Sequence, residues 1–345
     1  MDIGAAENYY RYILDLNQPL PRPKIVIFEL THRCNLRCGH CYNDGPDPSR
    51  QLTTGEVTSI LKGIPSPGTT ALGFTGGEVM VRADVMEILE AAHKMGFENI
   101  NIDSNGTLID EDTIGRFKEL GVKSLHVSLD GPEEINDQLR GNGSYRKVVK
   151  AIKLAVTAGI TVTLNMTVGQ LNAGYIQSLF NRVKPLEIHY FKVEPLLIKS
   201  KARHLQELLL EKSDILRVCD TIKVLQDSSP PTLVIDNLFK TYMEEKPLLG
   251  CPSGKSFCMI SREGRMFHCP VFTEHASPKD SLLGQDFAEV WGKSDFLNAL
   301  RDPGTFKTAC HNCKYLEICA GGCHARAFIA TGSFFERDPL CPFSI

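Results

Sequence analysis

Short runs of β-branched and aromatic residues alternate with amphipathic stretches between residues 24 and 194. The runs have the length and composition of strands, and the stretches between them carry apolar residues at helical spacing. We expect strands at residues 24–31, 70–76, 99–104, 124–130, 160–168 and 186–194. We expect helices at residues 54–62, 83–95, 110–120, 145–158 and 173–182.

This alternation of strand and helix favours parallel strands joined by right-handed crossovers. Either a barrel or an open doubly wound sheet fits the pattern. Several of the expected strands end in polar or glycine-rich segments, which is typical of functional loops at the carboxyl edge of a parallel sheet.

The remainder of the chain has a different character. Residues 203–227 predict a helix or a helical pair, and the prolines of 228–231 end it. From residue 250 onward cysteine and glycine are dense, and residues 256–269 predict a hairpin that turns near Glu263 and Gly264. We therefore expect four segments: an N-terminal extension (1–23), a barrel with its following helices (24–230), a bridging region (231–249) and a small cysteine-rich α+β domain (250–345).

Composition narrows the class of protein. The net charge of −3 over 345 residues gives no pull toward nucleic acid or an anionic membrane. The N-terminus lacks a signal pattern, and no apolar run reaches the roughly 18 residues of a membrane helix. We expect a cytoplasmic protein, in which twelve cysteines indicate metal ligation and not a disulfide framework.

Three of these cysteines, Cys34, Cys38 and Cys41, follow the first expected strand with the spacing C-x3-C-x2-C. A structural zinc site or an ordinary ferredoxin cluster has four protein ligands, whereas three leave one coordination position open for chemistry. The alternatives are a zinc site completed by His32 or His40, or a redox-active thiol loop.

Two further motifs follow expected strands: "FTGGEVMVR" at 74–82 and "SNGTLI" at 104–109. Together with the cysteine triad they make residues 24–195 resemble a radical S-adenosylmethionine (SAM) enzyme. The resemblance implies a partial (β/α)6 TIM-like barrel. It also implies a [4Fe–4S] cluster whose open iron is chelated by SAM.

The same resemblance assigns residues. Cys34, Cys38 and Cys41 match the cluster ligands, and an arginine fork at Arg140 suits the methionine carboxylate of SAM, although a surface ion pair is an alternative role. His40 stands where the family usually has an aromatic residue. The implied SAM contacts are Gly76, Gly77, Glu78, His40, Asn105, Ser128, Asp130, Arg140 and Asn165.

The C-terminal cysteines resemble the SPASM extension of radical SAM enzymes, which commonly carries two auxiliary [4Fe–4S] clusters. A zinc-binding region is the alternative. Cys258 lies outside the core spacing, and without it the first auxiliary cluster has an open iron. The implied ligands are Cys251, Cys258, Cys269 and Cys323 for auxiliary cluster I, and Cys310, Cys313, Cys319 and Cys341 for auxiliary cluster II.

Cys219 stands apart from both groups, in an amphipathic stretch. A cysteine in such a position is a small core residue in most proteins. The alternative is a tentative catalytic role as a hydrogen-atom donor that quenches a substrate radical.

The resemblance implies reductive cleavage of SAM to a 5′-deoxyadenosyl radical, which abstracts a hydrogen atom from the substrate. Our leading hypothesis is the maturation of a ribosomal peptide or protein by crosslinking, thioether formation, decarboxylation or epimerisation. The alternatives are a small-molecule enzyme acting on a haem-precursor side chain or an aminoglycoside-type sugar, and a non-catalytic zinc protein. Pro270 after Cys269 disfavours formylglycine formation.

The expected partners follow from this chemistry. A one-electron donor such as flavodoxin or ferredoxin would reduce the cluster. Only about 23 residues precede the first expected strand, so a peptide substrate would need a separate leader-peptide-binding protein or a direct surface. We expect no nucleic acid and no membrane partner.

Overall fold

The computed structural model describes residues 19–43, 50–65, 69, 71–199, 206–226, 230–247 and 250–343. The N-terminal extension up to residue 18 and the first residues of the helix expected from 203 lie outside the described residues. The chain divides into two compact units. Unit 1 comprises residues 1–34, 45–102 and 249–345, and unit 2 comprises residues 35–44 and 103–248.

In unit 1 a parallel sheet has the strand order β3-β2-β1-β8, and β9 closes it antiparallel to β8. Ile25 of β1 pairs with Ala71 of β2 on one side and with Phe257 of β8 on the other. The predicted hairpin therefore forms, and its first strand extends the sheet beside β1. The strands are β1 (Ile25–Thr31), β2 (Ala71–Gly76), β3 (Ile100–Ser104), β8 (Phe257–Ile260) and β9 (Met266–Phe267).

Three helices of unit 1 begin at side-chain caps. Thr53 and Glu56 form a reciprocal capping box at the start of α2, and the Asp286 side chain accepts a hydrogen bond from the Glu289 amide at the start of α10. Ser294 caps α11 in the same way. The helices are α2 (Thr54–Gly63), α3 (Val85–Lys94), α10 (Phe287–Lys293), α11 (Asp295–Arg301), α12 (Leu316–Cys319) and α13 (His324–Thr331).

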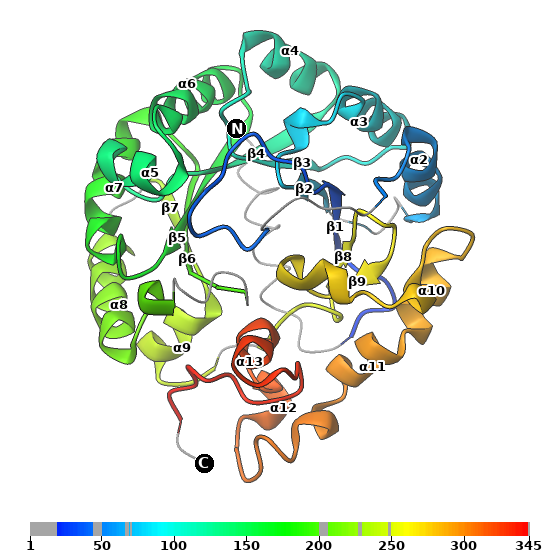
Figure 1. Ribbon diagram of the computed structural model, residues 1–345, viewed down its shortest axis with the longest axis vertical. Helices are drawn as coiled ribbons and strands as arrows, with labels where there is room; N and C mark the ends of the chain where they lie inside the picture. The colour runs from blue at the N-terminus through cyan, green and yellow to red at the C-terminus, as the bar shows by residue number, and fades with distance from the viewer. Residues whose placement is uncertain are drawn as a thin grey trace. The chain divides into compact units, whose positions relative to one another are not determined.

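Unit 2 contains the parallel strands β4, β5, β6 and β7 in this order. The green helices α6, α7 and α8 lie along one side of these strands (Figure 1). The strands are β4 (Val122–Ser128), β5 (Thr161–Val168), β6 (Tyr190–Pro195) and β7 (Thr232–Ile235). The helices are α4 (Glu111–Glu119), α5 (Glu133–Arg140), α6 (Ser144–Thr157), α7 (Ile176–Val183), α8 (Lys212–Gln226) and α9 (Asn237–Glu244).

The two faces of the unit 2 sheet differ in polarity, because successive side chains of a strand point to opposite faces. One face is apolar and fully buried, as Leu125, Val127 and Leu164 show. The other face is polar and is in part exposed. It carries Ser124, His126 and Ser128 of β4, Thr163, Asn165 and Thr167 of β5, and Lys192 and Glu194 of β6.

Every strand and helix expected between residues 24 and 194 is present, with ends that shift by a few residues. The largest shift is at β6, which begins at Tyr190 and not at 186. The chain first makes a 3-10 turn at Lys184–Leu186 and then a left-handed residue at Glu187 (φ 56°). The expected bridging region, 231–249, contains β7 and α9, so it contributes regular structure to unit 2.

Candidate active site

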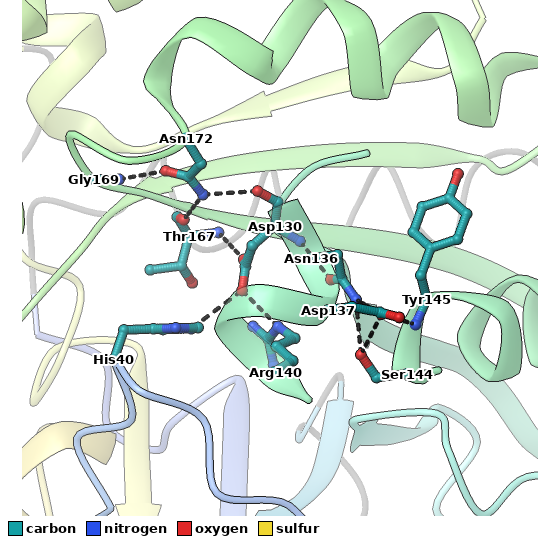
Figure 2. A network of polar contacts seen from close by, with 10 residues as sticks. All are labelled: His40, Asp130, Asn136, Asp137, Arg140, Ser144, Tyr145, Thr167, Gly169 and Asn172. Carbon is teal, nitrogen blue, oxygen red and sulfur yellow. Dashed lines mark hydrogen bonds and ion pairs between the residues drawn. The ribbon is translucent and has the colours of Figure 1, made fainter. Parts of the chain in front are cut away.

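A buried carboxylate lies at the centre of a polar network in unit 2 (Figure 2). Asp130 follows β4 and is fully buried. One carboxylate oxygen, Oδ2, accepts from Arg140 Nε at 2.5 Å and lies 3.1 Å from His40 Nε2. The other oxygen, Oδ1, accepts from the amide of Thr167 at 3.0 Å. Asp130 therefore joins the cysteine loop, α5 and β5 through one side chain.

The charges in this network stabilise one another. Burial alone would raise the pKa of Asp130, but Arg140 and His40 outweigh it and hold the pKa well below its usual range. Burial opposes the charge on Arg140 in the same way, and Asp130 together with Cys38 and Cys41 outweighs it, so its pKa is raised. The influence of Cys38 and Cys41 shows that the guanidinium lies close to two of the three predicted cluster ligands.

Two asparagines that the sequence did not single out fix the backbone around Asp130. The amide nitrogen of Asp130 donates to Asn136 Oδ1 at 3.1 Å, and Asn172 Nδ2 donates to the carbonyl of Asp130 at 2.9 Å. Asn172 Nδ2 also donates to the Thr167 carbonyl, and its Oδ1 accepts from Gly169 N. Nothing in the local pattern marks these residues, because no sequence motif accompanies an asparagine that bonds mainly to backbone groups.

The end of α5 is held by a third side chain. Asp137 accepts from the amides of Gly143 and Tyr145 at 2.6 and 2.9 Å and from the Ser144 hydroxyl at 3.0 Å. These bonds satisfy amides at the start of α6. The turn that carries Arg140 is thereby fixed between two helices.

The cysteine loop is also tied to the loop after β3. Asn105 Nδ2 donates to Asn35 Oδ1 at 2.8 Å, and Asn35 Nδ2 donates to Thr107 Oγ1 at 2.8 Å. Asn105 Oδ1 accepts from the Thr107 amide and hydroxyl. Asn105, an implied SAM contact, therefore orients the loop that carries Cys38.

In unit 1 the backbone of Gly77 and Glu78, in the motif of residues 74–82, packs tightly against the end of β1 and the residues that follow it. The amides of Gly77 and Glu78 donate to the carbonyls of Thr31 and Arg33, both at 2.8 Å. A Cβ on Gly77 would lie 2.4 Å from the His32 carbonyl oxygen, so no other residue fits there. Glu78 is 1% exposed, and its Oε1 accepts from the Met80 amide at 3.0 Å.

Arg82, the last residue of the same motif, is a buried clamp that the sequence did not identify. It donates to the carbonyls of Leu30 and Leu52, both at 2.8 Å, and forms an ion pair with Asp84. This pair holds the pKa of Asp84 at about 2. Arg82 thereby fixes the end of β1, from which the cysteine segment departs.

The polar face of the unit 2 sheet presents several of the implied contact residues. Ser128 and Asn165 are register partners on β4 and β5, and Asn165 Oδ1 is buried with no hydrogen-bond partner among the described residues. On the same face His126 Nδ1 lies 2.7 Å from Asp103 Oδ1, and His126 Nε2 lies 3.2 Å from the Ser124 hydroxyl. A chain of this kind can hold and move a proton.

Four C-terminal cysteines lie close enough to influence one another. Burial, together with the neighbouring Cys341, Cys310 and Cys313, raises the pKa of Cys319 to about 12. The pKa of Cys310 is raised by burial and then by Cys313 and Cys341. Thiols crowded in this way resist ionisation unless a metal centre takes up their charge. The four thiols therefore lie near one another, and their role as ligands of auxiliary cluster II stays a prediction.

The predicted ligands of auxiliary cluster I divide into two groups. Burial raises the pKa of Cys323 to about 11, and Cys251 is among the groups that raise it, so these two thiols are neighbours. Cys258 lies in the middle of β8 and is fully buried. Its neighbours in the strand, Phe257 and Met259, belong to one face of the unit 1 sheet, so Cys258 points to the opposite face.

One charged group, Arg301, acts on the buried thiol of Cys258. Burial raises the pKa of the Cys258 thiol, and Arg301 opposes this effect. The role of Cys258 as a ligand therefore stays a prediction, as does the role of Cys269. The single cysteine at 219 is buried in α8, its Sγ lies 3.6 Å from the Phe239 carbonyl, and burial raises its pKa to about 11.

Comparison with known protein families gives the same class of protein as the motifs of the sequence. Residues 28–183 match the model of the Radical SAM superfamily. These residues form a radical SAM domain, and enzymes of this superfamily use SAM, a [4Fe–4S] cluster and an electron donor. None of the described helices is long and apolar enough to cross a membrane.

Three known proteins are similar to this chain over most of its length. The "AdoMet-dependent heme synthase" of Methanosarcina barkeri is 29% identical over 92% of this chain and 96% of its own length. The "PqqA peptide cyclase" of Bradyrhizobium diazoefficiens is 26% identical over 93% of this chain and 87% of its own length. Streptococcus suis SuiB bound to SAM is 20% identical and has a TM-score of 0.79 over 94% of this chain and 78% of its own. The predicted partial α/β barrel with a cysteine-rich C-terminal region is confirmed.

Proposed function

We propose that this radical SAM enzyme oxidatively decarboxylates a propionate side chain of an iron tetrapyrrole. The observation that carries the proposal is the similarity to the haem synthase of M. barkeri, which extends over nearly the whole of both chains. This changes the order of our sequence-based hypotheses, in which a peptide substrate came first. Haem carries vinyl groups where iron coproporphyrin III carries propionates, so a haem synthase must be able to replace one by the other.

The residues around the cysteine loop suit SAM and its cluster. Cys34, Cys38 and Cys41 would supply three thiolates, and the guanidinium of Arg140 lies close to the last two of them. The bound cofactors supply a 5′-deoxyadenosyl radical that removes a hydrogen atom from an unactivated carbon. Arg140 is held by Asp130 through its Nε atom, which leaves its two terminal nitrogens to donate to a carboxylate such as that of SAM.

In this proposal Asp130 positions Arg140 and His40 and does not itself contact SAM. Its two oxygens are already used by Arg140, His40 and the amide of Thr167. Asn105 has a similar role toward Asn35. Ser128 and Asn165, in contrast, lie on the exposed polar face and retain hydrogen-bonding capacity for a ligand.

We assign the substrate to the polar face of the unit 2 sheet. Lys192, which forms an ion pair with Glu194 at 2.6 Å, can bind a carboxylate of the substrate. The side chain loses a hydrogen atom from the carbon next to the ring, then carbon dioxide and one electron, and a vinyl group remains. The electron requires an oxidant, for which an auxiliary [4Fe–4S] cluster in the C-terminal region is the proposed acceptor.

The test uses anaerobically reconstituted enzyme with SAM, dithionite and iron coproporphyrin III. Mass spectrometry should show a tetrapyrrole that has lost carbon dioxide and two hydrogens per converted side chain, with one 5′-deoxyadenosine formed for each. The Cys38→Ala variant should form neither product. Cleavage of SAM by the wild type without any change in tetrapyrrole mass would refute the substrate and leave the radical chemistry intact.

A peptide substrate is the second candidate, because the PqqA peptide cyclase matches 93% of this chain. In this case the enzyme would form a bond within a ribosomal peptide, and a separate leader-binding protein would present the substrate. A short precursor peptide encoded beside the gene, modified by the enzyme in place of coproporphyrin, would favour this candidate.

A further inference from the structure

A single lysine is buried where the two predicted auxiliary cluster sites approach each other. Lys255 is 4% exposed and lies in the turn between Cys251 and β8. Its amide donates to the Pro252 carbonyl at 3.1 Å, and its carbonyl accepts from the Leu20 amide at 2.9 Å. The backbone on both sides of the side chain is thereby fixed.

This turn is packed against the segment that carries Cys319. The amide of Gly250 donates to the Ile318 carbonyl at 2.9 Å, and a Cβ on Gly250 would lie 2.5 Å from the Cys319 carbonyl oxygen. Only glycine permits this approach. Cys251 and Cys319, which we assign to different clusters, are therefore brought together at the start of the turn.

The charge of Lys255 interacts with both of these cysteines. Burial lowers the pKa of Lys255, and Cys251 and Cys319 act in the opposite direction. Lys255 also acts on His324, the residue that follows Cys323. The ammonium group therefore lies near residues of both predicted clusters.

Lys255 has no carboxylate partner among the described residues. The nearby Asp338 pairs with Arg326 at 2.7 Å, so its charge is already balanced. A buried ammonium without a counter-charge is strongly unfavourable. Clusters held by thiolates carry net negative charge, and they would supply the counter-charge that the protein itself does not.

We propose that Lys255 tunes both auxiliary clusters, its buried positive charge stabilising their reduced states and making them better electron acceptors. The inference rests on the auxiliary clusters of the proposed function. A nearby positive charge raises the reduction potential of an iron–sulfur centre, and low solvent exposure strengthens the effect. Lys255 would therefore act on the clusters through its charge and would not contact the substrate.

The test measures the midpoint potentials of the auxiliary clusters in the holoenzyme by EPR-monitored redox titration. Lys255→Met should move both potentials to more negative values, and Lys255→Arg should leave them close to those of the wild type. Lys314→Met is the matched control. Lys314 follows Cys313 directly but is exposed, so water screens its charge and its removal should shift neither potential appreciably.

Iron counts separate this proposal from the proposed function. A wild type that holds only one cluster would overturn both. With all clusters present, unchanged potentials in Lys255→Met, or an equal shift in Lys314→Met, would overturn the role of Lys255 alone. If Lys255→Met loses iron and Lys255→Arg keeps it, the clusters depend on the charge, which supports the proposal. Loss of iron from both variants would show that only packing matters.

Discussion

Replacing Asp130 by asparagine should open unit 2 around α5, because it leaves the Arg140 guanidinium buried without a counter-charge. Asp130 is fully buried, and the Arg140 side chain is 11% exposed. An asparagine can still accept from the Thr167 amide, but its amide group meets two donors, Arg140 Nε and His40 Nε2. Breaking a buried ion pair by removing one partner costs about 3–5 kcal/mol.

Unit 2 offers a control with the same bond length at the surface. Glu133 Oε1 accepts from Arg146 Nε at 2.5 Å, the distance found between Asp130 and Arg140, but the Arg146 side chain is 80% exposed. Glu133→Gln should therefore cost less than about 1 kcal/mol. The contrast isolates burial as the cause.

Hydrogen–deuterium exchange of the peptides that span β4 and α5 measures the local opening free energy. A loss of 3–5 kcal/mol corresponds to roughly a hundredfold to a few thousandfold lower protection in Asp130→Asn. The double variant that combines Asp130→Asn with Arg140→Met should recover most of the lost protection, since Arg140→Met removes the unpaired positive charge. If Asp130→Asn and Glu133→Gln lower protection equally, the reasoning from burial is wrong.

The same pair predicts a dependence on pH. The pKa of Asp130 in the folded protein lies below its value of about 3.9 in the unfolded chain. The carboxylate therefore contributes stability that is fully present above that value and is lost as the pH falls toward the folded pKa. The difference between wild type and Asp130→Asn should shrink in this acid range and stay constant near neutrality.

Three further substitutions test the site and the substrate assignment. Gly77→Ala should lower 5′-deoxyadenosine formation about a hundredfold, because the added Cβ displaces the loop, whereas Gly55→Ala, which meets no atom within 4 Å, should leave it unchanged. Cys219→Ala should cost about 1 kcal/mol of stability and leave turnover intact, since the thiol is a core group; trapped, unquenched product would contradict this. Lys192→Met should raise KM for iron coproporphyrin III about tenfold, while Glu194→Gln, which frees the lysine, should not; equal effects would exclude a carboxylate site there.

Hydrophobic periodicity was sufficient to predict every strand up to residue 194 and the helices α2, α3, α4, α6 and α7, because each has one apolar face and the period differs between strand and helix. It missed β7 and α9. Thr232–Ile235 is only four residues long, and its position is set by pairing with β6. It also missed α5, whose sequence EEINDQLR is almost entirely polar, so that only capping and contacts with neighbouring elements reveal the helix.

The candidate site also contains some residues that the sequence identified and others that it missed. The sequence singled out Cys38, Cys41, Arg140 and Asp130 through the family resemblance, and the structure brings these four residues close together, while their roles as cluster ligands and SAM contacts stay predictions. The sequence could not show that Asp130 is saturated by protein donors, because the Thr167 amide lies 37 residues away in sequence. Asn136 and Asn172 were missed because an asparagine whose partners are mainly backbone groups carries no motif in the sequence.

Buried charge distinguishes the parts of this protein that are complete by themselves from the parts that need a cofactor. Asp130 and Arg140 neutralise each other, so this region keeps its geometry without help and can present Arg140 in a fixed orientation. Lys255 has no such partner in the described residues, and the thiols beside it are crowded and hard to ionise. Each of these two features is unfavourable alone, and a negatively charged metal cluster bound by the thiolates would relieve both at once. We therefore expect the charges of the C-terminal region to balance only when metal is bound, whereas the Asp130 network is preorganised before any cofactor arrives.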